Sequence, residues 1–507
     1  MGSRSSGDYA RILSGTAANV AGIGCAAVAI LVVQVLMTRT LGREEFGVVT
    51  VLTQAAFVVS FATRSGMDMA VLRTVAIHVG ENEIGPVRSL VARATAIAGA
   101  VSAFVAVLVA LAAEPISSLV GGGAATHRAV LAAAVGLPFL ATANVWLAAT
   151  RGLKLMRYTL YVFWAGQNAV WILLTLLLWL VEASAATSVL AYSLSWAWAA
   201  GAAWWSWRRE AARWPTARPA RGWLEDLLRY SGPRAPAAFL AQMLFWIDLF
   251  VLTQFAGGAD VGVYSAALRA GQVVMLFLTS VNMMFAPFVA DLYNRGEREH
   301  LDRLYKTLTR WILAGTLPVF LLIALAPEAV MRIFGRGFAV GTTALLILTA
   351  GQLANIATGS AGFILVMVGR TGWDLVVYAC SVALDIALAL WLCPRYGIEG
   401  AAVANAVTLV ASNCARLLAV RRFVAIQPYD HTYARLAGPA LLCGLAMWGA
   451  DALAGDAGYL PDLVGMGVVG GAVYAAAYLA IGLSPQERRG AAALWARARD
   501  RSARSMG

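Results

Sequence analysis

Long apolar runs separated by short polar connections make up most of this chain. About fourteen of these runs have the ~20 residues that a helix needs to cross the hydrocarbon core of a bilayer. We expect transmembrane helices at roughly 12–38, 47–72, 89–113, 128–150, 158–181, 185–207, 230–256, 261–290, 304–326, 340–368, 373–393, 398–424, 432–453 and 460–483. The pattern predicts an all-α, polytopic membrane protein.

The same turn pattern occurs twice at a fixed separation. The turn at 256–264 has a counterpart at 41–49, which is 256 − 41 = 215 positions earlier, and Gly122 in a second loop falls on Gly337 in the same register. A register kept at two loops indicates an internal repeat. Each copy holds about six helices, an even number, so we expect a parallel pseudo-two-fold repeat about an axis along the membrane normal.

The repeat gives the expected domain organisation. An N-terminal six-helix bundle occupies residues 1–208, a basic cytoplasmic linker 209–225, and a C-terminal six-helix bundle 226–425. Two additional transmembrane helices follow at 426–483, and a basic cytoplasmic tail occupies 484–507. We expect no further folded domain between the spans, because the remaining connections are short.

Composition supports a membrane protein and changes how the charge is interpreted. The chain is 60% hydrophobic and 13% charged, with a mean hydropathy of +0.71, which a soluble globule does not show. Its net charge of +12 is scattered over many short segments, so we expect membrane lipids and no nucleic acid as partners. About thirty Lys and Arg fall on alternate connections and about six on the other side, which predicts cytoplasmic termini and a place in the cytoplasmic membrane.

A few ionisable residues interrupt the apolar runs. Arg234 and Asp248 lie on the seventh predicted span, Arg269 on the eighth, and Arg64 and Asp68 on the second. A charge in the hydrocarbon core costs from ~2.5 to over ~10 kcal/mol, so such groups face a partner or a water-filled cavity. The sequence therefore predicts a polar path between the helices.

The spacing of these residues leaves two interpretations open. Arg64 and Asp68 are one turn apart on one helix face, while Asp248 and Arg269 lie at a similar depth below the same turn, within reach of each other across a hairpin. Each couple either neutralises itself or holds a substrate or a coupling ion. In the repeat register Gln54 is the equivalent of Arg269. We therefore assign substrate binding to Arg64, Arg269, Arg234 and Gln54. We assign coupling or ion pairing to Asp68 and Asp248.

The chain carries no motif of a soluble catalytic site. The glycines at 121–123 lack the GK[ST] of a phosphate loop, and there is no nucleophile elbow or pair of catalytic carboxylates. The cysteines and histidines are separated along the chain without ligand spacing. We expect no enzyme, no cofactor and no metal site, and the sequence disfavours an ATP-driven pump and a membrane glycosyltransferase.

Four segments resemble the oligosaccharide flippases of bacterial polysaccharide export: Arg39–Gly47, Gly66–Arg73, Gly262–Arg269 and Phe334–Phe338. The similarity covers about residues 10–425. These flippases belong to the superfamily that also contains lipid II flippases and multidrug extruders. The resemblance implies two bundles in a V around a cationic cavity, with Arg64 and Arg269 as cavity cations. The implied activity is alternating-access transport of a lipid-linked (polyprenyl diphosphate) oligosaccharide, alongside a polysaccharide polymerase and glycosyltransferases.

Two related functions remain as alternatives. Lipid II flippases carry arginines in their first span, whereas this chain has none between Arg11 and Arg39. A cation-coupled multidrug exporter needs a membrane-embedded carboxylate, and in the first half the only deep one, Asp68, lies beside Arg64. Both differences favour the oligosaccharide flippase.

Overall fold

The computed structural model describes residues 2–80, 85–153, 155–212, 214, 225, 235–454 and 458–483. Its regular elements there are all helices, which confirms the all-α prediction. Ten described helices are long and apolar enough to cross a membrane, while the count of about fourteen spans stays a prediction. The tail at 484–507 and the linker residues 213 and 215–224 lie outside the described residues.

The first half of the chain consists of long helices whose bounds lie near those of the predicted spans. They are α1 (Gly2–Thr63), α2 (Met67–Gly80), α3 (Val87–Leu111), α4 (Ala113–Leu119), α5 (Gly123–Gly152), η1 (Thr159–Gly166), α6 (Gln167–Trp179) and α7 (Ala185–Ala211).

The second half contains more and shorter pieces. After helical residues 235–243 come α9 (Ile247–Leu252), α10 (Gly258–Gln272), η2 (Val273–Met275), α11 (Leu276–Asn294), α12 (Arg298–Leu325), α13 (Pro327–Phe334), η3 (Arg336–Gly341), α14 (Thr342–Ala357), α15 (Ala361–Met367) and α16 (Thr371–Phe423). The chain ends with η4 (His431–Leu436), α17 (Ala437–Ala454), α18 (Tyr459–Ala477) and η5 (Tyr478–Gly482).

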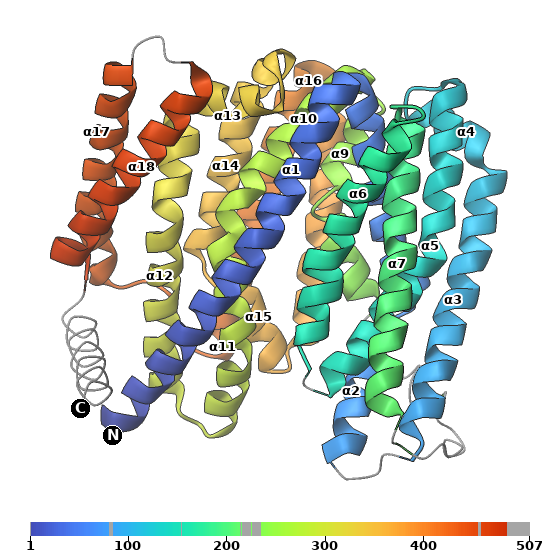
Figure 1. Ribbon diagram of the computed structural model, residues 1–507. Helices are drawn as coiled ribbons and strands as arrows, with labels where there is room; N and C mark the ends of the chain where they lie inside the picture. Colours follow the sequence, from blue (N-terminus) through green and yellow to red (C-terminus); the bar gives the residue numbers. More distant parts are fainter. Residues whose placement is uncertain are drawn as a thin grey trace, which may run out of the picture.

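Small residues let the helices of the first half pack closely. Figure 1 shows α3, α5 and α7 side by side. A Cβ atom at Gly136 of α5 would lie 2.6 Å from the Ser193 hydroxyl of α7, and that hydroxyl donates to the Ala132 carbonyl at 2.7 Å. Lipid offers no hydrophobic driving force between helices, so close contacts and interhelical hydrogen bonds of this kind hold the bundle together.

Two glycines reverse the chain inside the longest helices. Gly42 in α1 has φ 78° and Gly397 in α16 has φ 55°, a left-handed conformation that glycine adopts at little cost. Gly42 lines a cavity together with Arg332 of α13, and Figure 1 shows α13 at the end of the bundle opposite the N-terminus. We call this end the outer end, because the predicted topology places it outside the cell.

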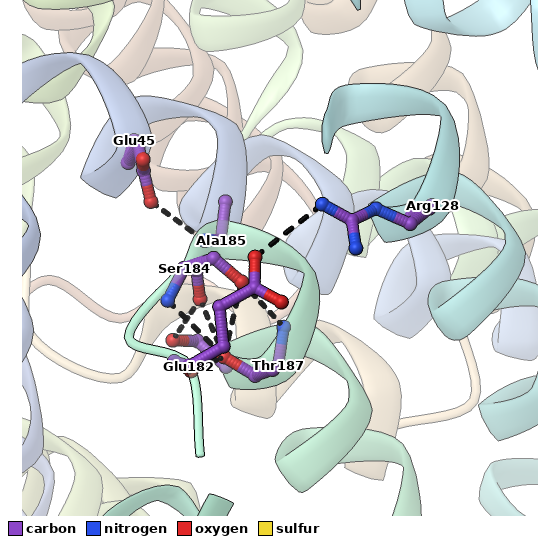
Figure 2. A network of polar contacts seen from close by, with 7 residues as sticks. Glu45, Arg128, Glu182, Ser184, Ala185 and Thr187 are labelled. Carbon is purple, nitrogen blue, oxygen red and sulfur yellow. Dashed lines mark hydrogen bonds and ion pairs between the residues drawn. The ribbon is translucent and has the colours of Figure 1, made fainter. Parts of the chain in front are cut away.

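Polar contacts tie the first half together at the outer end. The Glu45 carboxylate of α1 accepts a hydrogen bond from the Ala185 amide at 2.7 Å, and Arg128 of α5 pairs with Glu182 at 3.3 Å (Figure 2). Ser184 caps the first turn of α7. These contacts fix α1, α5 and the α6–α7 connection relative to one another.

The two halves meet at the outer end through backbone atoms. A Cβ at Gly47 of α1 would lie 2.6 Å from the Gly258 carbonyl oxygen, and a Cβ at Gly262 of α10 would lie 1.9 Å from the Arg43 carbonyl oxygen. Since Gly258 and Gly262 are the repeat equivalents of Arg43 and Gly47, the contact is reciprocal, as a two-fold relation requires. We call it the glycine contact.

Helices α17 and α18 lie at the edge of the molecule against α12 (Figure 1). Cys443 and Met447 of α17 and Met466 and Tyr474 of α18 form a small buried cluster with leucines of α12. These two helices therefore pack on the outside of the second half.

Four helical segments are interrupted within apolar stretches. Residues 64–66 separate α1 from α2, 244–246 precede α9, η2 separates α10 from α11, and 358–360 separate α14 from α15. Irregular backbone at membrane depth is tolerated where it is buried in protein or lines a cavity. Three of the four interruptions belong to the second half.

Candidate substrate and coupling site

Arg64 lies at the interruption between α1 and α2. Ser65 and Gly66 have φ values of 51° and 70°, so α1 ends at Thr63, directly before the arginine, and α2 begins at Met67. The Arg64 Nη1 donates to Asp68 Oδ2 at 3.0 Å and its Nε donates to the Ser60 carbonyl at 3.0 Å. The side chains of Arg64 and Asp68 are 3% and 9% exposed. The predicted one-turn pair forms and is buried.

The charge around this pair does not sum to zero. The Arg64 guanidinium also stacks on Phe61, 3.9 Å from the ring centroid, and its Nη2 has no hydrogen-bond partner among the described residues. Arg151, in the last turn of α5, interacts electrostatically with both Arg64 and Asp68. Asp68 pairs with Arg64 alone among the described residues, so the cluster of Arg64, Asp68 and Arg151 has two cations for one anion.

Arg269 lies in the last turn of α10 and faces the boundary between the halves. Its guanidinium carbon lies 4.6 Å from the ring centroid of Trp246, beside the interruption that precedes α9. Tyr192 of α7, in the first half, is close enough to influence it electrostatically. The Nε atom is buried without a partner in the described part of the chain.

The predicted pair between Asp248 and Arg269 is wrong. Asp248 accepts a hydrogen bond from the hydroxyl of Tyr264 instead, and within the described residues neither Asp248 nor Arg269 has an ion-pair partner. Tyr264 and Arg269 are five residues apart on α10, which rotates them by ~500°, or ~140° apart around the axis. The face of α10 that meets Asp248 therefore differs from the face that carries Arg269.

Asp248 has a second carboxylate as its neighbour. Asp385 of α16 is fully buried and interacts electrostatically with Asp248, and neither of its oxygens has a hydrogen-bond partner in the described residues. The amide of Asn405, also on α16, lies beside Asp248. Two buried carboxylates without a cation repel each other. This acid pair suits the uptake of a proton or a small cation.

The remaining predicted residues contribute less to this arrangement. Gln54 is buried in α1, and its amide makes a long contact of 3.4 Å to the Thr53 hydroxyl. Arg234 lies outside the described residues. The sequence analysis missed Asp385, although an acid within an apolar span is the same signal that identified Asp248. It also missed Arg151, which lies directly after the predicted span at 128–150.

Comparison with known proteins identifies the family of this chain. A family model described as polysaccharide biosynthesis protein matches residues 12–292, more than half of the chain. The chain belongs to this polysaccharide biosynthesis protein family. A second family model, MatE, matches residues 233–391.

Proteins similar to this chain include curated proteins and solved structures. The chain is 24% identical over 202 residues to the probable low-salt glycan biosynthesis flippase Agl15 of Haloferax volcanii, a match that covers 40% of this chain. The chain spans 43% of the length of that relative.

The chain also shares its fold with solved transporters. The structure of the lipid II flippase MurJ in an inward closed conformation matches with a TM-score of 0.71 at 12% identity, covering 90% of this chain and 97% of that one. An inward-facing multidrug resistance MATE family transporter of the MOP superfamily matches with a TM-score of 0.65 at 14% identity, covering 79% and 94%. The chain therefore has the fold of the multidrug/oligosaccharidyl-lipid/polysaccharide exporter superfamily.

Proposed function

We propose that this protein is a flippase that moves a lipid-linked (polyprenyl diphosphate) oligosaccharide across the cytoplasmic membrane for cell-surface polysaccharide synthesis. The observation that carries the proposal is a buried arginine in each half, Arg64 and Arg269, each beside an interrupted helix. The family match and the name of the Haloferax volcanii relative support the glycan. In this proposal a polysaccharide polymerase and glycosyltransferases act with the flippase, which itself catalyses no reaction.

The charges of the two sites suit a diphosphate. Arg269 has no carboxylate partner among the described residues, and the cluster of Arg64, Asp68 and Arg151 carries two cations for one anion. Guanidinium groups present planar, permanently charged donors that match phosphate oxygens. A diphosphate between the halves gives these cations the counter-charge that the protein does not supply.

The arrangement of the halves suits alternating access. The glycine contact brings the backbones of the two halves together at the outer end. Separation of the halves at this point, with closure at the other end, exposes Arg64 and Arg269 to the outside. We assign the coupling role to Asp248 together with Asp385, whose shared site takes up a proton or cation, and a structural role to Asp68.

The direct test is export of a lipid-linked glycan by arginine variants. Arg64→Ala and Arg269→Ala each lower export at least ~10-fold, the loss expected for one charge-assisted contact, while the protein still reaches the membrane. Lys at either position retains partial export, since it keeps charge without the planar fork. Arg303→Ala, an exposed arginine on α12, is the matched control and exports normally. Normal export by both alanine variants contradicts the proposal.

Topology is a separate part of the proposal. We place both termini and the 209–225 linker in the cytoplasm. A single cysteine at Ala183 then reacts with an impermeant thiol reagent added outside intact cells, and one at Ala217 does not. Labelling at Ala217 from outside reverses the assignment of the outer end.

The acid pair favours a second candidate, a cation-coupled multidrug exporter, because Asp248 and Asp385 are the buried carboxylates that such a protein needs. A lipid II flippase is the other alternative, on the strength of the MurJ fold. Binding assays separate the three: the proposed flippase binds polyprenyl diphosphate oligosaccharides. An exporter binds an organic cation with loss of binding in Asp248→Asn, and a lipid II flippase binds the peptidoglycan precursor.

A further inference from the structure

A cavity of about 500 Å³ lies at the outer end, away from the buried site. Its walls come from α1 around Gly42, from the segment that joins α13 to η3, and from Tyr459 at the start of α18. It therefore brings together the first half, the second half and the two additional helices. Its volume is in the range of sites that hold a small molecule or a head group.

Four arginines line this cavity: Arg39, Arg43, Arg332 and Arg336. The lining contains no carboxylate. Arg332 pairs with Glu328 nearby, but within the described residues Arg39, Arg43 and Arg336 have no ion pair. We call this site the outer arginine pocket.

The gathering of these cations is unusual for the side of the membrane on which the predicted topology places them. Loops outside the cell are poor in Lys and Arg, and this chain has only about six there. Four of them line one cavity, although Arg39 and Arg336 are 297 positions apart (336 − 39). Like charges repel, and three of the four have no counter-ion among the described residues, so an anion bound between them would stabilise the arrangement.

Hydrogen bonds to the protein orient two of these guanidinium groups, those of Arg39 and Arg43. Arg39 donates from Nε to the Ile333 carbonyl at 3.0 Å and from Nη2 to the Tyr459 hydroxyl at 2.6 Å. Arg43 donates from Nη1 to the Gly337 carbonyl at 3.2 Å. A Cβ at Gly337 would lie 3.2 Å from Arg43 Nε, so the absence of a side chain there leaves room for the guanidinium. All these partners are neutral, and other donors of both groups remain available.

Another arginine at the outer end shows the opposite arrangement. Arg128 pairs with Glu182 and joins α5 to the α6–α7 connection (Figure 2). Its charge is neutralised by the protein itself. The outer arginine pocket thus differs from a structural ion pair in the same part of the molecule.

We infer that the outer arginine pocket binds a phosphate-bearing group, either the diphosphate of a lipid-linked molecule that has reached the outer leaflet or the phosphate of a membrane lipid. Forked guanidinium donors match the oxygens of both. The inference goes beyond the proposed function and does not depend on it, because none of the pocket residues belongs to the Arg64 or Arg269 sites.

The first experiment uses inorganic pyrophosphate as the probe. Purified full-length protein in detergent is titrated with pyrophosphate, and binding is measured by calorimetry and by the shift in thermal unfolding temperature. Arg43→Gln and Arg336→Gln each weaken binding ~10-fold or more, as expected for loss of a charge-assisted hydrogen bond. The controls Arg128→Gln and Arg395→Gln each remove one positive charge predicted to face outside, and they leave the affinity within about twofold.

A second measurement needs no variant. Phenylglyoxal modifies accessible arginines of the wild-type protein, and peptide mass spectrometry locates the products. Pyrophosphate slows modification of Arg336 and Arg43 but not of Arg395. The inference is overturned by equal protection of all three, by an equal loss of affinity in the control variants, by displacement of pyrophosphate by equimolar sulfate, or by no binding.

Competition identifies the source of the phosphate. Displacement of pyrophosphate by polyprenyl diphosphate but not by phosphatidylglycerol in mixed micelles assigns the pocket to a lipid-linked diphosphate, and the reverse result assigns it to a membrane lipid. Arg64→Ala and Arg269→Ala retain pyrophosphate binding at the pocket. Loss of export with intact pocket binding, or loss of pocket binding with intact export, therefore tests the two proposals separately.

Discussion

The two proposed substrate-binding arginines, one in each half of the molecule, have different surroundings. Arg64 in the first half has Asp68 within 3.0 Å, whereas Arg269 in the second half lies over the Trp246 ring and has no carboxylate partner among the described residues. The carboxylate of the second half, Asp248, bonds instead with Tyr264 and lies beside Asp385. At Arg64 the cation and the anion share one site, whereas Arg269 and Asp248 are apart, although the second half has a buried ion pair elsewhere, between Arg416 and Asp374 at 3.4 Å. We therefore expect Arg64 to affect stability more, and Arg269 to gain more from a bound anion.

The largest effect on stability is expected at Asp68. Asp68→Asn leaves Arg64 as a buried charge without its anion, which costs about 3–5 kcal/mol of unfolding free energy. Thermal unfolding in detergent measures the loss. The double variant Arg64→Met/Asp68→Leu removes both charges and regains most of the stability while export stays lost. A double variant as unstable as Asp68→Asn contradicts a stabilising pair.

A smaller effect on stability is expected at Asp248, because its partner, the Tyr264 hydroxyl, is neutral. Tyr264→Phe removes the hydroxyl that donates to Asp248 and lowers the unfolding free energy by about 1.5–3 kcal/mol, the range for hydrogen bonds to charged groups. Tyr474→Phe is the matched control, because the Tyr474 hydroxyl is buried without a hydrogen-bond partner in the described residues. Equal unfolding temperatures for the two variants show that the Tyr264 hydroxyl does not stabilise Asp248.

The contact between the halves gives a third test. Gly262→Ala places a Cβ 1.9 Å from the Arg43 carbonyl oxygen, and Gly47→Ala places one 2.6 Å from the Gly258 carbonyl oxygen. Overpacking of this kind costs about 1–3 kcal/mol, and we expect the larger cost for Gly262→Ala. Both variants open the outer end, so that a cysteine at Phe46, which is fully buried, reacts faster with a thiol reagent.

The control for that test lies in the same loop. A Cβ at Gly257 meets nothing within 4 Å, so Gly257→Ala leaves the reaction rate of the cysteine unchanged. An equal rate in Gly257→Ala and Gly262→Ala shows that the glycine contact does not hold the outer end closed.

The smallest effect is expected for the aromatic partner of Arg269. Trp246→Leu removes the ring that faces the guanidinium, a contact worth about 0.5–2 kcal/mol. The arginine stays charged, so export falls less than in Arg269→Ala. A loss of export as large as that of Arg269→Ala gives Trp246 a direct part in binding the substrate.

The sequence predicted what depends on local spacing. Apolar run lengths predicted the helices, and the one-turn spacing of Arg64 and Asp68 predicted their pair, because a helix fixes which residues four apart meet. The repeat register also located the loops at Gly47 and Gly262. Their direct contact was not predicted, since an internal repeat fixes equivalence along the chain but not the distance between its copies.

The sequence failed where the helices are interrupted. Depth below a turn was a sound argument for Asp248 and Arg269, but pairing also needs the rotation of each helix, and the interruption at 244–246 resets that rotation. Asp248 and Asp385 are neighbours although they are 137 positions apart in the sequence (385 − 248). A single sequence carries no signal for a contact between positions so far apart. Arg151 was not predicted, because a basic residue at the end of a span looks the same in the sequence whether it marks the topology or belongs to a site.

The glycine contact has a kinetic consequence. The glycine contact consists of main-chain atoms, so its separation breaks no ion pair and changes no side-chain rotamer. The closed and open forms therefore differ at this contact in dispersion and solvation alone. The barrier to separating the glycine contact itself is then nearly independent of ionic strength and of pH. Any dependence of the transport cycle on proton or salt concentration must enter elsewhere, through the outer arginine pocket, whose side chains also join the halves, and through the carboxylates and guanidinium groups deeper in the bundle.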